Sequence, residues 1–324
     1  MTLINRYTLV IAGVIIFLVA TPVMIYGIRG YVYDFDNNRL IKTGILVVKT
    51  EPKEVRITAA GGGINRVYDK AGTIRFLRPD DYSLTVQKDG FHTWSKRLSV
   101  RGGLVTWANE GTDKIYLLPL EPKLKKETAD YVPEEQSPNY VYILEQSQTT
   151  PGTADLIRVN NNATSDKSVI LTGLIYRENS SVVSSANGLV FVIIDRVLYQ
   201  AGTALEYVAE GVDFAQWDEN INKLIYGNAH EINFFDPFDA GNGQTELLIR
   251  TSETGGGFCV MPTLGYALRA YGNEIRAIEL DGRDKRNIYK ILNFNSTAEI
   301  ISCDKEGEEI IVKNEGAYRT YSLR

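Results

Sequence analysis

The stretch DDYSLTVQKDGFHTWSKRLSV, residues 80–100, predicts two antiparallel strands joined by a tight turn. Apolar and polar side chains alternate along residues 82–86, and the same alternation returns along residues 98–100. Phe91 and Trp94 follow the turn directly. Because large aromatic side chains usually pack inside a fold, we expect both to be core residues of a small β-domain and not a ligand site.

Further short apolar runs flank this hairpin, at residues 45–50, 55–59, 73–77 and 115–118. Each is bounded by Pro, Asp or Gly, which are typical turn residues. Residues 44–121 are therefore predicted to form a small antiparallel β-sandwich.

This segment resembles the PEGA domain. The resemblance rests on TGILVVKTEP at residues 43–52 and on the arrangement of Tyr82, Gly90, Phe91 and Trp94 in the hairpin. The motif Pro-Glu-Gly-Ala is replaced by Pro-Lys-Glu-Val, at residues 52–55. The resemblance implies a spacer domain behind a membrane anchor in a bacterial envelope protein, and it implies no catalytic residue. The stretch at residues 33–52 is similar to that in members from small-genome uncultured bacteria.

The N-terminal segment 7–28 is uncharged and predominantly apolar. At 1.5 Å per residue it is long enough to cross a hydrocarbon core of about 30 Å. We therefore predict a short tail at 1–6, a transmembrane signal-anchor at 7–28 that contacts the lipid bilayer, and a juxtamembrane linker at 29–43. A cleaved signal peptide is the alternative, although residues 18–20 form a poor cleavage site.

The orientation of the anchor is less well defined by the sequence. Arg29, Arg39 and Lys42 follow the span and favour a cytoplasmic C-terminal side. A very short N-terminal tail favours the opposite, and we expect a single-pass protein whose C-terminal domains are extracytoplasmic.

The charge is unevenly distributed. Residues 1–126 contain 19 Lys and Arg against 11 Asp and Glu, and residues 127–324 contain 16 against 29. The acidic second part argues against nucleic acid as a partner, because phosphates would be repelled.

The second part of the chain contains repeats. Four stretches share the pattern strand, turn, strand, turn, strand, and Val183, Ala215, Cys259 and Ile301 lie at equivalent places in them. A fifth, less regular unit starts at Asn139. A period near 40 residues with three or four strands per unit predicts a β-propeller of about five blades over residues 122–324.

The repeat around Trp217-Asp218 and residues 223–226 resembles TolB-type or WD-type propeller repeats. The chain ends directly after a third strand, so residues 118–128 are expected to supply the outer strand of the last unit and to close the ring. An incomplete ring, or a sandwich misread as blades, is the alternative.

No motif for chemistry stands out, so we assign no catalytic, cofactor-binding or metal-binding residue and expect no cofactor. His92 lies on an exposed-looking hairpin without partner ligands, and His230 is the only other histidine. The glycines at 61–63 are expected to form a hairpin loop, since no Lys-Ser/Thr follows them. The stretches 34–38 and 236–246 are rich in Asp but lack the spacing of a calcium loop.

The sequence contains two adjacent pairs of glutamates and one pair of cysteines. The adjacent acids Glu134-Glu135 and Glu308-Glu309 are expected to point to opposite faces and to be solvated. Cys259 and Cys303 are near the starts of neighbouring units but one position out of register, so two buried thiols are favoured over a disulfide.

The resulting hypothesis is a non-enzymatic, membrane-anchored envelope protein whose propeller binds a protein or a polysaccharide at the mouth of its central channel. The alternatives are a membrane-tethered glycan hydrolase or lyase, which needs converging carboxylates, and a structural surface-layer subunit.

Overall fold

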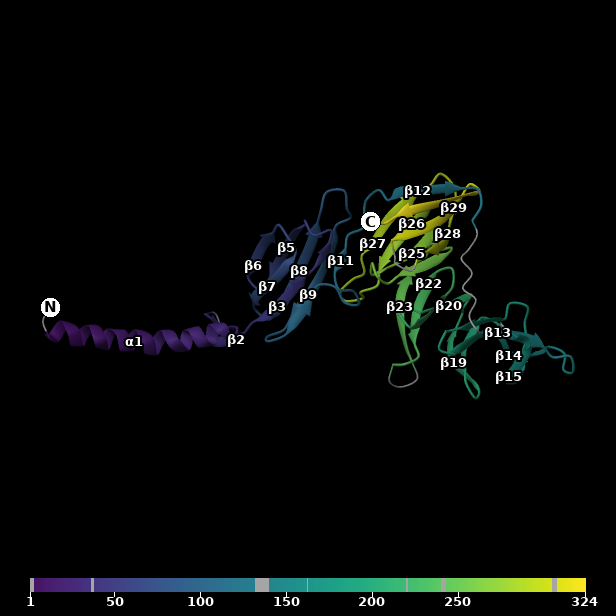
Figure 1. The fold of residues 1–324 in the computed structure, drawn as a ribbon, viewed down its shortest axis with the longest axis horizontal. Coiled ribbons are helices and arrows are strands. Elements are labelled where there is room, and N and C mark those ends of the chain that lie inside the picture. Colours follow the sequence, from purple (N-terminus) through teal and green to yellow (C-terminus); the bar gives the residue numbers. More distant parts are fainter. Residues whose placement is uncertain are drawn as a thin grey trace.

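The computed structural model describes residues 3–35, 38–131, 140–161, 163–219, 221–239, 243–304 and 308–324. A helix, a short hairpin, a β-sandwich and an array of five further sheets follow one another along the chain (Figure 1). The helix projects from one end, and the sheets form the rest of the molecule. The predicted all-β fold with a single N-terminal helix is confirmed.

The helix α1 spans Leu3–Ile28 and includes Pro22. Its segment Val10–Ile28 has a mean hydropathy of 2.4, and no part of it is buried against the protein. A helix of this length and composition can cross a membrane, and a signal sequence shares these properties. The strands β1 (Tyr31–Asp34) and β2 (Arg39–Lys42) form an antiparallel hairpin directly after it.

The sandwich contains a four-stranded sheet in the order β6-β5-β8-β9, a three-stranded sheet in the order β10-β3-β7, and the short pair β11-β4. The strands are β3 (Gly44–Val48), β4 (Thr50–Glu51), β5 (Arg56–Gly61), β6 (Ile64–Tyr68), β7 (Gly72–Leu77), β8 (Asp80–Gln87), β9 (Trp94–Val100), β10 (Val105–Trp107) and β11 (Ile115–Tyr116). One core fills the space between the sheets, with Leu46, Tyr82 and Trp94 fully buried.

Three predictions about this unit are tested by these contacts. Trp94 is a core residue as expected, and Phe91 packs half-buried against the same core. The glycines at 61–63 form the β5–β6 hairpin turn, all with positive φ. The expectation of a purely antiparallel sandwich is wrong, because β10 pairs with β3 and β11 with β4 in parallel after the chain crosses over from β9.

The C-terminal sheets are consecutive antiparallel meanders, which we number as blades 1 to 5. Blade 1 contains β13 (Tyr140–Gln146), β14 (Thr153–Asn160) and β15 (Ala163–Ile175); blade 2 contains β16 (Ser181–Ser184), β17 (Val190–Ile194), β18 (Val197–Ala201) and β19 (Leu205–Glu210); blade 3 contains β20 (Phe214–Asp218), β21 (Lys223–Gly227), β22 (Glu231–Asp236) and β23 (Gln244–Arg250); blade 4 contains β24 (Phe258–Met261), β25 (Tyr266–Tyr271), β26 (Glu274–Glu279) and β27 (Ile288–Asn293); blade 5 contains β28 (Ala298–Cys303), β29 (Glu309–Asn314), β30 (Ala317–Ser322) and β12 (Lys123–Thr128). The four residues predicted to occupy equivalent places lie in the first strands of blades 2 to 5.

The outer strand of blade 5 comes from the other end of the array. β12 pairs antiparallel with β30, from Lys123 opposite Ser322 to Thr128 opposite Tyr318. The predicted clasp from residues 118–128 is therefore confirmed as a strand. It covers the edge that β30 would otherwise expose.

The five blades form an open arc. Buried side chains join blade 1 to blade 2, blade 2 to blade 3, blade 3 to blade 4 and blade 4 to blade 5. Within the described ranges no such core joins blade 5 back to blade 1, and Figure 1 shows β13–β15 far from β28 and β29. The clasp completes a blade but does not close a ring, so the incomplete-ring alternative describes the structure.

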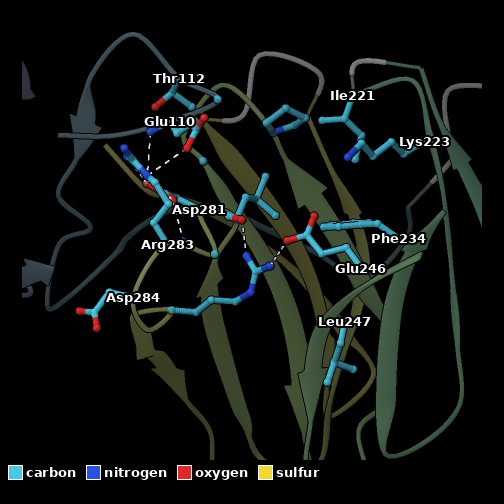
Figure 2. Close-up of a pocket in the computed structure, with 16 residues that line it drawn as sticks. Glu110, Thr112, Ile221, Lys223, Phe234, Glu246, Leu247, Asp281, Arg283 and Asp284 are labelled. Carbon is cyan, nitrogen blue, oxygen red and sulfur yellow. Dashed lines mark hydrogen bonds and ion pairs between the residues drawn. The ribbon is translucent and has the colours of Figure 1, made fainter. Parts of the chain in front are cut away.

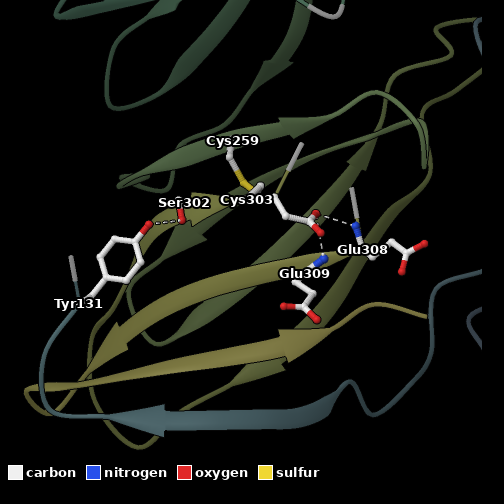
Figure 3. Close-up of a disulfide and its surroundings, with 7 residues drawn as sticks. Tyr131, Cys259, Ser302, Cys303, Glu308 and Glu309 are labelled. Carbon is white, nitrogen blue, oxygen red and sulfur yellow. Dashed lines mark hydrogen bonds between the residues drawn. A yellow bond between two sulfur atoms is a disulfide. The ribbon is translucent and has the colours of Figure 1, made fainter. Parts of the chain in front are cut away.

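Cys259 and Cys303 form a disulfide between blades 4 and 5, with their Cα atoms 6.2 Å apart (Figure 3). The preference for two buried thiols is therefore wrong. It assumed strict alternation along β28, but the pairing with β29 shifts between Ile300 and Ser302. This bulge inserts one residue and turns Cys303 to the same side as Ile300, which faces blade 4.

The paired acids at 308 and 309 lie next to the clasp (Figure 3). Glu309 is 2.5 Å from the Nζ atom of Lys125 in β12, and Glu308 pairs with Arg324. They are half-buried ion-pair partners rather than fully solvated carboxylates. Glu134 and Glu135 lie outside the described residues.

Candidate functional site

The sandwich and the propeller-like array share one strand segment. Ile115 and Leu117 point into the sandwich core, whereas Tyr116 and Leu118 point into the core of blades 4 and 5. The hydroxyl of Tyr266 in β25 also donates to the backbone oxygen of Tyr116 at 3.0 Å. Because alternate side chains of one strand enter two cores, the two units cannot move apart without exposing apolar surface.

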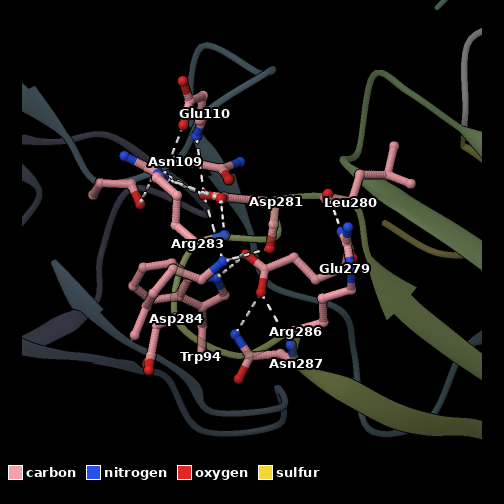
Figure 4. Close-up of polar contacts among 12 residues, drawn as sticks. Trp94, Asn109, Glu110, Glu279, Leu280, Asp281, Arg283, Asp284, Arg286 and Asn287 are labelled. Carbon is pink, nitrogen blue, oxygen red and sulfur yellow. Dashed lines mark hydrogen bonds and ion pairs between the residues drawn. The ribbon is translucent and has the colours of Figure 1, made fainter. Parts of the chain in front are cut away.

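A buried lysine, Lys96, joins the two units through Glu279 and Asp281, which are labelled in Figure 4. The Nζ atom of Lys96 in β9 lies 3.1 Å from Glu279 Oε1 and 3.4 Å from Asp281 Oδ2, and it donates to the backbone oxygen of Asp281 at 2.8 Å. The three side chains are between 0% and 3% exposed. The ammonium group therefore has three acceptors, which matches its three hydrogens.

Glu279 is satisfied just as fully. Its Oε1 atom accepts from the indole N–H of Trp94 at 2.9 Å, and its Oε2 atom accepts from the backbone and side-chain nitrogens of Asn287 at 3.1 and 2.7 Å. Burying a carboxylate is costly unless it is paired and hydrogen-bonded, and here both conditions hold.

Asp281 joins this cluster to a neighbouring arginine. Arg283 donates to both carboxylate oxygens of Asp281, with a shortest distance of 2.7 Å, and lies 3.0 Å from Glu110 on the sandwich. Burial opposes the charge of Asp281. The hydrogen bonds from Arg283 and the charge of Lys96 outweigh burial, so the pKa of this carboxyl lies below its usual value.

A cleft opens beside this cluster, between the sandwich loop 110–112 and blades 3 and 4 (Figure 2). Its volume is about 1020 Å³. Ile221, Phe234 and Leu280 contribute apolar surface, and Leu247 stands at its edge with 43% of its surface exposed. We call this space the junction cleft.

Most charged residues of the junction cleft form ion pairs, and Asp284 instead accepts from the backbone nitrogen of Arg97. Arg283 is held by Asp281 and Glu110, and Arg286 pairs with Glu246 across blades 3 and 4. Lys223 is 3.8 Å from Asp236 and keeps about a third of its side chain exposed. Among the cations of this lining, Lys223 has the longest ion-pair contact.

Two glycines permit this close assembly. Gly265 has a φ of +80°, and a Cβ atom there would lie 3.2 Å from Thr112 of the sandwich loop. A Cβ atom on Gly282 would lie 2.9 Å from the guanidinium of Arg286. Any larger residue at these positions would push the sandwich or Arg286 away.

Hydrogen bonds and ion pairs stabilise the charged form of three carboxyl groups. A general acid or base needs a carboxyl group whose pKa is raised toward neutrality. Within the described parts of the chain, the carboxyl groups with shifted pKa values are Asp281, Glu231 and Glu274, and in all three the pKa is lowered. Among the described residues no group of three or more His, Cys, Asp or Glu side chains is placed to hold a metal ion.

Comparisons with known proteins give general resemblances only. No family model matches the chain, and no curated protein matches it. Similar solved structures include the Mitotic Checkpoint Complex, at 9% identity over 91% of this chain and 92% of that chain with a TM-score of 0.43. The Cps50 (Swd1) β-propeller domain of Myceliophteria thermophila has 10% identity over 87% and 97% and a TM-score of 0.41. YCF48 bound to D1 peptide has 11% identity over 88% and 100% and a TM-score of 0.39. The blade assignment rests on the strand order.

The sites discussed in the sequence analysis do not coincide with the junction cleft. We predicted a binding site at the mouth of a central channel. Such a site requires a closed ring, whereas the five blades form an open arc. Parts of both Asp-rich stretches, residues 36–37 and 240–242, lie outside the described residues. The cluster around Lys96 was missed, although one signal was available: Lys96 stands between Trp94 and Leu98 on the inward face of its strand. A lysine at an inward position indicates a buried acidic partner.

His92 belongs to the junction and not to an exposed hairpin, so that expectation is wrong. Its ring stacks on Tyr289 of β27 at 4.9 Å, because the hairpin tip docks on blade 4 through a hydrogen bond from Tyr289 to the oxygen of Thr93. Burial lowers the pKa of His92, and a hydrogen bond with the backbone of Lys290 only partly offsets this.

This burial predicts a pH-dependent stability. Well above pH 6.5, His92 is neutral in both the folded and the unfolded chain. Below it the unfolded chain binds a proton that the folded chain resists, so the free energy of unfolding falls until the lowered pKa is reached. We expect His92→Gln to reduce the decrease in the free energy of unfolding between pH 7.5 and pH 5, measured by urea unfolding. His230→Gln, at an exposed site, should retain the wild-type slope, and equal slopes in wild type and H92Q would contradict the assignment.

Proposed function

We propose that this chain is a membrane-anchored, non-enzymatic cell-envelope protein that binds a segment of a protein partner in the junction cleft. In this proposal residues 7–28 anchor the chain in the bilayer and residues 29–43 form the juxtamembrane linker. Residues 44–121 form a PEGA-like spacer, although no family model supports that resemblance. Residues 122–324 form the open propeller.

The observation that carries the proposal is the chemistry of the cleft lining. Apolar side chains lie between arginine–carboxylate pairs, and arginine and apolar groups are the usual components of protein-binding surfaces. Sugars are usually held against exposed aromatic rings, but Phe234, the aromatic residue in this lining, is only 5% exposed. A protein segment is therefore favoured over a polysaccharide.

The junction gives the cleft a fixed position. The buried cluster around Lys96 and the shared strand at 115–118 join spacer and propeller as one body. A rigid body behind a membrane helix presents its binding site at a constant height, which suits capture of a partner at a fixed distance from the bilayer.

The disulfide supports an extracytoplasmic position of the propeller. Disulfides persist in oxidising compartments and are rare in the cytosol. Cys259 and Cys303 are the only cysteines of the chain, and they are bonded to each other. This agrees with the expectation from the short N-terminal tail and opposes the charge distribution after the span.

A photo-crosslinking amino acid tests the binding site. At Leu247, on the edge of the cleft, we expect a discrete protein adduct in intact cells, whereas the same group at Tyr207 should give none. Tyr207 is a matched control because it is 64% exposed on β19 of blade 2. Lys223→Glu should lower the Leu247 adduct several-fold.

Three outcomes would contradict the proposal. Equal labelling at Leu247 and Tyr207 would show that the cleft has no selectivity. An adduct that resists protease and is removed by glycosidases would replace the protein partner by a polysaccharide. If the yield of the Leu247 adduct were unchanged in the Lys223→Glu variant, the partner would not contact the cleft lining at Lys223.

A further inference from the structure

The sandwich end nearest the helix exposes large apolar side chains. Phe76, Leu104 and Val105 are 59%, 56% and 52% exposed, and they line a common groove with Ile28, the last residue of α1. In a soluble domain such side chains would normally be spread singly over the surface. Here they gather beside Ile28, where the helix ends.

The backbone at Phe76 is adapted to this exposure. Gly44 of β3 pairs with Leu77, but Leu46 pairs with Ile74, so Arg75 and Phe76 together oppose Ile45 in a β-bulge. Phe76 has a φ of +58°, a conformation that is uncommon for any residue with a bulky side chain. A β-bulge turns a side chain away from the face that strict alternation would give it. Backbone strain at an exposed aromatic residue indicates a functional role for that residue.

Hydrogen bonds fix this end against the helix. The backbone oxygen of Gly30 accepts from both the backbone nitrogen and the hydroxyl of Thr43, at 2.8 and 2.7 Å. The nitrogen of Gly103 in turn donates to the oxygen of Thr43 at 2.9 Å, and Ile45 donates to Leu104 at 3.0 Å. The exposed apolar side chains are thus held directly beside the end of the apolar helix.

Cations surround the apolar side chains. Arg29, Lys42 and Arg75 line the same groove, and Arg101 lies on the loop that leads to Leu104. All four are exposed, and among the described residues none of them forms an ion pair with a carboxylate. None of the described residues that line the groove is acidic. Basic residues beside a membrane span are attracted by anionic headgroups.

We propose that these residues form a membrane-facing patch that rests on the anionic bilayer surface in which α1 is inserted. The patch consists of Phe76, Leu104, Val105, Arg29, Lys42, Arg75 and Arg101. The apolar side chains enter the headgroup region and the cations contact lipid phosphates, as in interfacial amphipathic segments. The patch holds the sandwich at a set angle to the bilayer, in place of free rotation about the linker. The inference rests on the proposed membrane anchor.

Quenching of tryptophan fluorescence by brominated lipid tests the patch in the full-length chain. The chain is placed in nanodiscs of phosphatidylcholine and phosphatidylglycerol (7:3) with bromine near the headgroups. The native Trp94 and Trp217 are buried, and Trp107 is replaced by Phe. Phe76→Trp should then be quenched several-fold more than Leu120→Trp, a site beyond β11 that is 51% exposed.

A reference in the helix separates the two hypotheses. Phe17→Trp reports insertion of α1, with bromine placed deeper in the acyl chains. If Phe17→Trp is not quenched, the proposed anchor fails. If Phe17→Trp is quenched but Phe76→Trp is quenched no more than Leu120→Trp, the patch is wrong and the anchor stands.

Charge variants test the lipid preference. Arg75→Glu with Arg101→Glu should reduce the quenching of Phe76→Trp several-fold, whereas Arg56→Glu, exposed at the opposite end of the sandwich, should leave it unchanged. Nanodiscs of phosphatidylcholine alone should give the same reduction without any substitution. Quenching that is insensitive to both changes would overturn the contact with anionic headgroups.

Discussion

Replacing Lys96 by Met is expected to lower the free energy of unfolding by about 3 to 5 kcal/mol. The substitution preserves most of the volume and removes the charge that Glu279 and Asp281 share. Arg283 still neutralises Asp281. Glu279 becomes a buried carboxylate whose remaining hydrogen-bond donors, on Trp94 and Asn287, are uncharged. Breaking a buried ion pair on one side costs far more than the pair contributes as a whole.

Denaturant unfolding of the detergent-solubilised chain, followed by tryptophan fluorescence, provides the measurement. Trp94 donates to Glu279 and so reports directly on the junction. Arg97→Met is the matched control, since Arg97 is the next residue of β9 and its side chain is 64% exposed in its ion pair with Asp81. That surface pair is worth no more than about 1 kcal/mol.

Adding Glu279→Gln to Lys96→Met should recover part of the lost stability, because the uncompensated charge disappears while Trp94 keeps an acceptor. The assignment of a buried charge cluster would be wrong if Lys96→Met and Arg97→Met had similar small effects. It would also be wrong if Glu279→Gln deepened the loss caused by Lys96→Met.

The elements that sequence predicts well are those with regular local patterns. The alternation along residues 82–86 and the repeated strand–turn pattern after residue 181 depend only on neighbouring residues, so β8 and the four-stranded blades follow from them. The clasp was also predicted, and β12 covers the edge of β30.

Bulges explain where the same reasoning fails. Strict alternation places Cys303 on the face away from blade 4, and it places Phe76 on the same face as Ile74. In each strand a β-bulge inserts one residue and reverses the direction of the side chain that follows or occupies it. Nothing in the apolar pattern of either strand marks the insertion. The disulfide and the exposure of Phe76 are therefore evident only from the structure.

The candidate site depends on contacts between distant parts of the chain. Lys96 and Glu279 are separated by more than 180 residues, and the cleft needs loop 110–112 to meet blade 4. Sequence marks Lys96 as unusual on an inward face but does not say which acid it meets. It also does not show that the arc stays open, since that depends on how blade 1 is placed relative to blade 5.

Removing the disulfide is the second substitution with a large expected effect. Cys259 and Cys303 are 44 residues apart, and closing a loop of this length lowers the entropy of the unfolded chain by an amount equivalent to about 4 kcal/mol. We expect Cys259→Ala with Cys303→Ala to lose roughly 2 to 4 kcal/mol in denaturant unfolding, with blades 4 and 5 most affected. Ser302→Ala, which leaves the bond intact and removes only a hydroxyl contact with Tyr131, should stay within about 1 kcal/mol of wild type.

The same bond reports the compartment in living cells. Because the chain has only two cysteines, rapid acid quenching followed by a maleimide of high mass should give no shift before reduction and a shift of two labels after it. Two labels without reduction would mean that the thiols are kept reduced, as in a cytosolic compartment, and the extracytoplasmic position of the propeller would have to be abandoned. The loss of stability tests whether the disulfide forms, and the labelling in cells tests on which side of the membrane the propeller lies. Both cysteines lie against the core between blades 4 and 5, so oxidised protein must lose stability when the bond is removed, whichever side of the membrane it comes from.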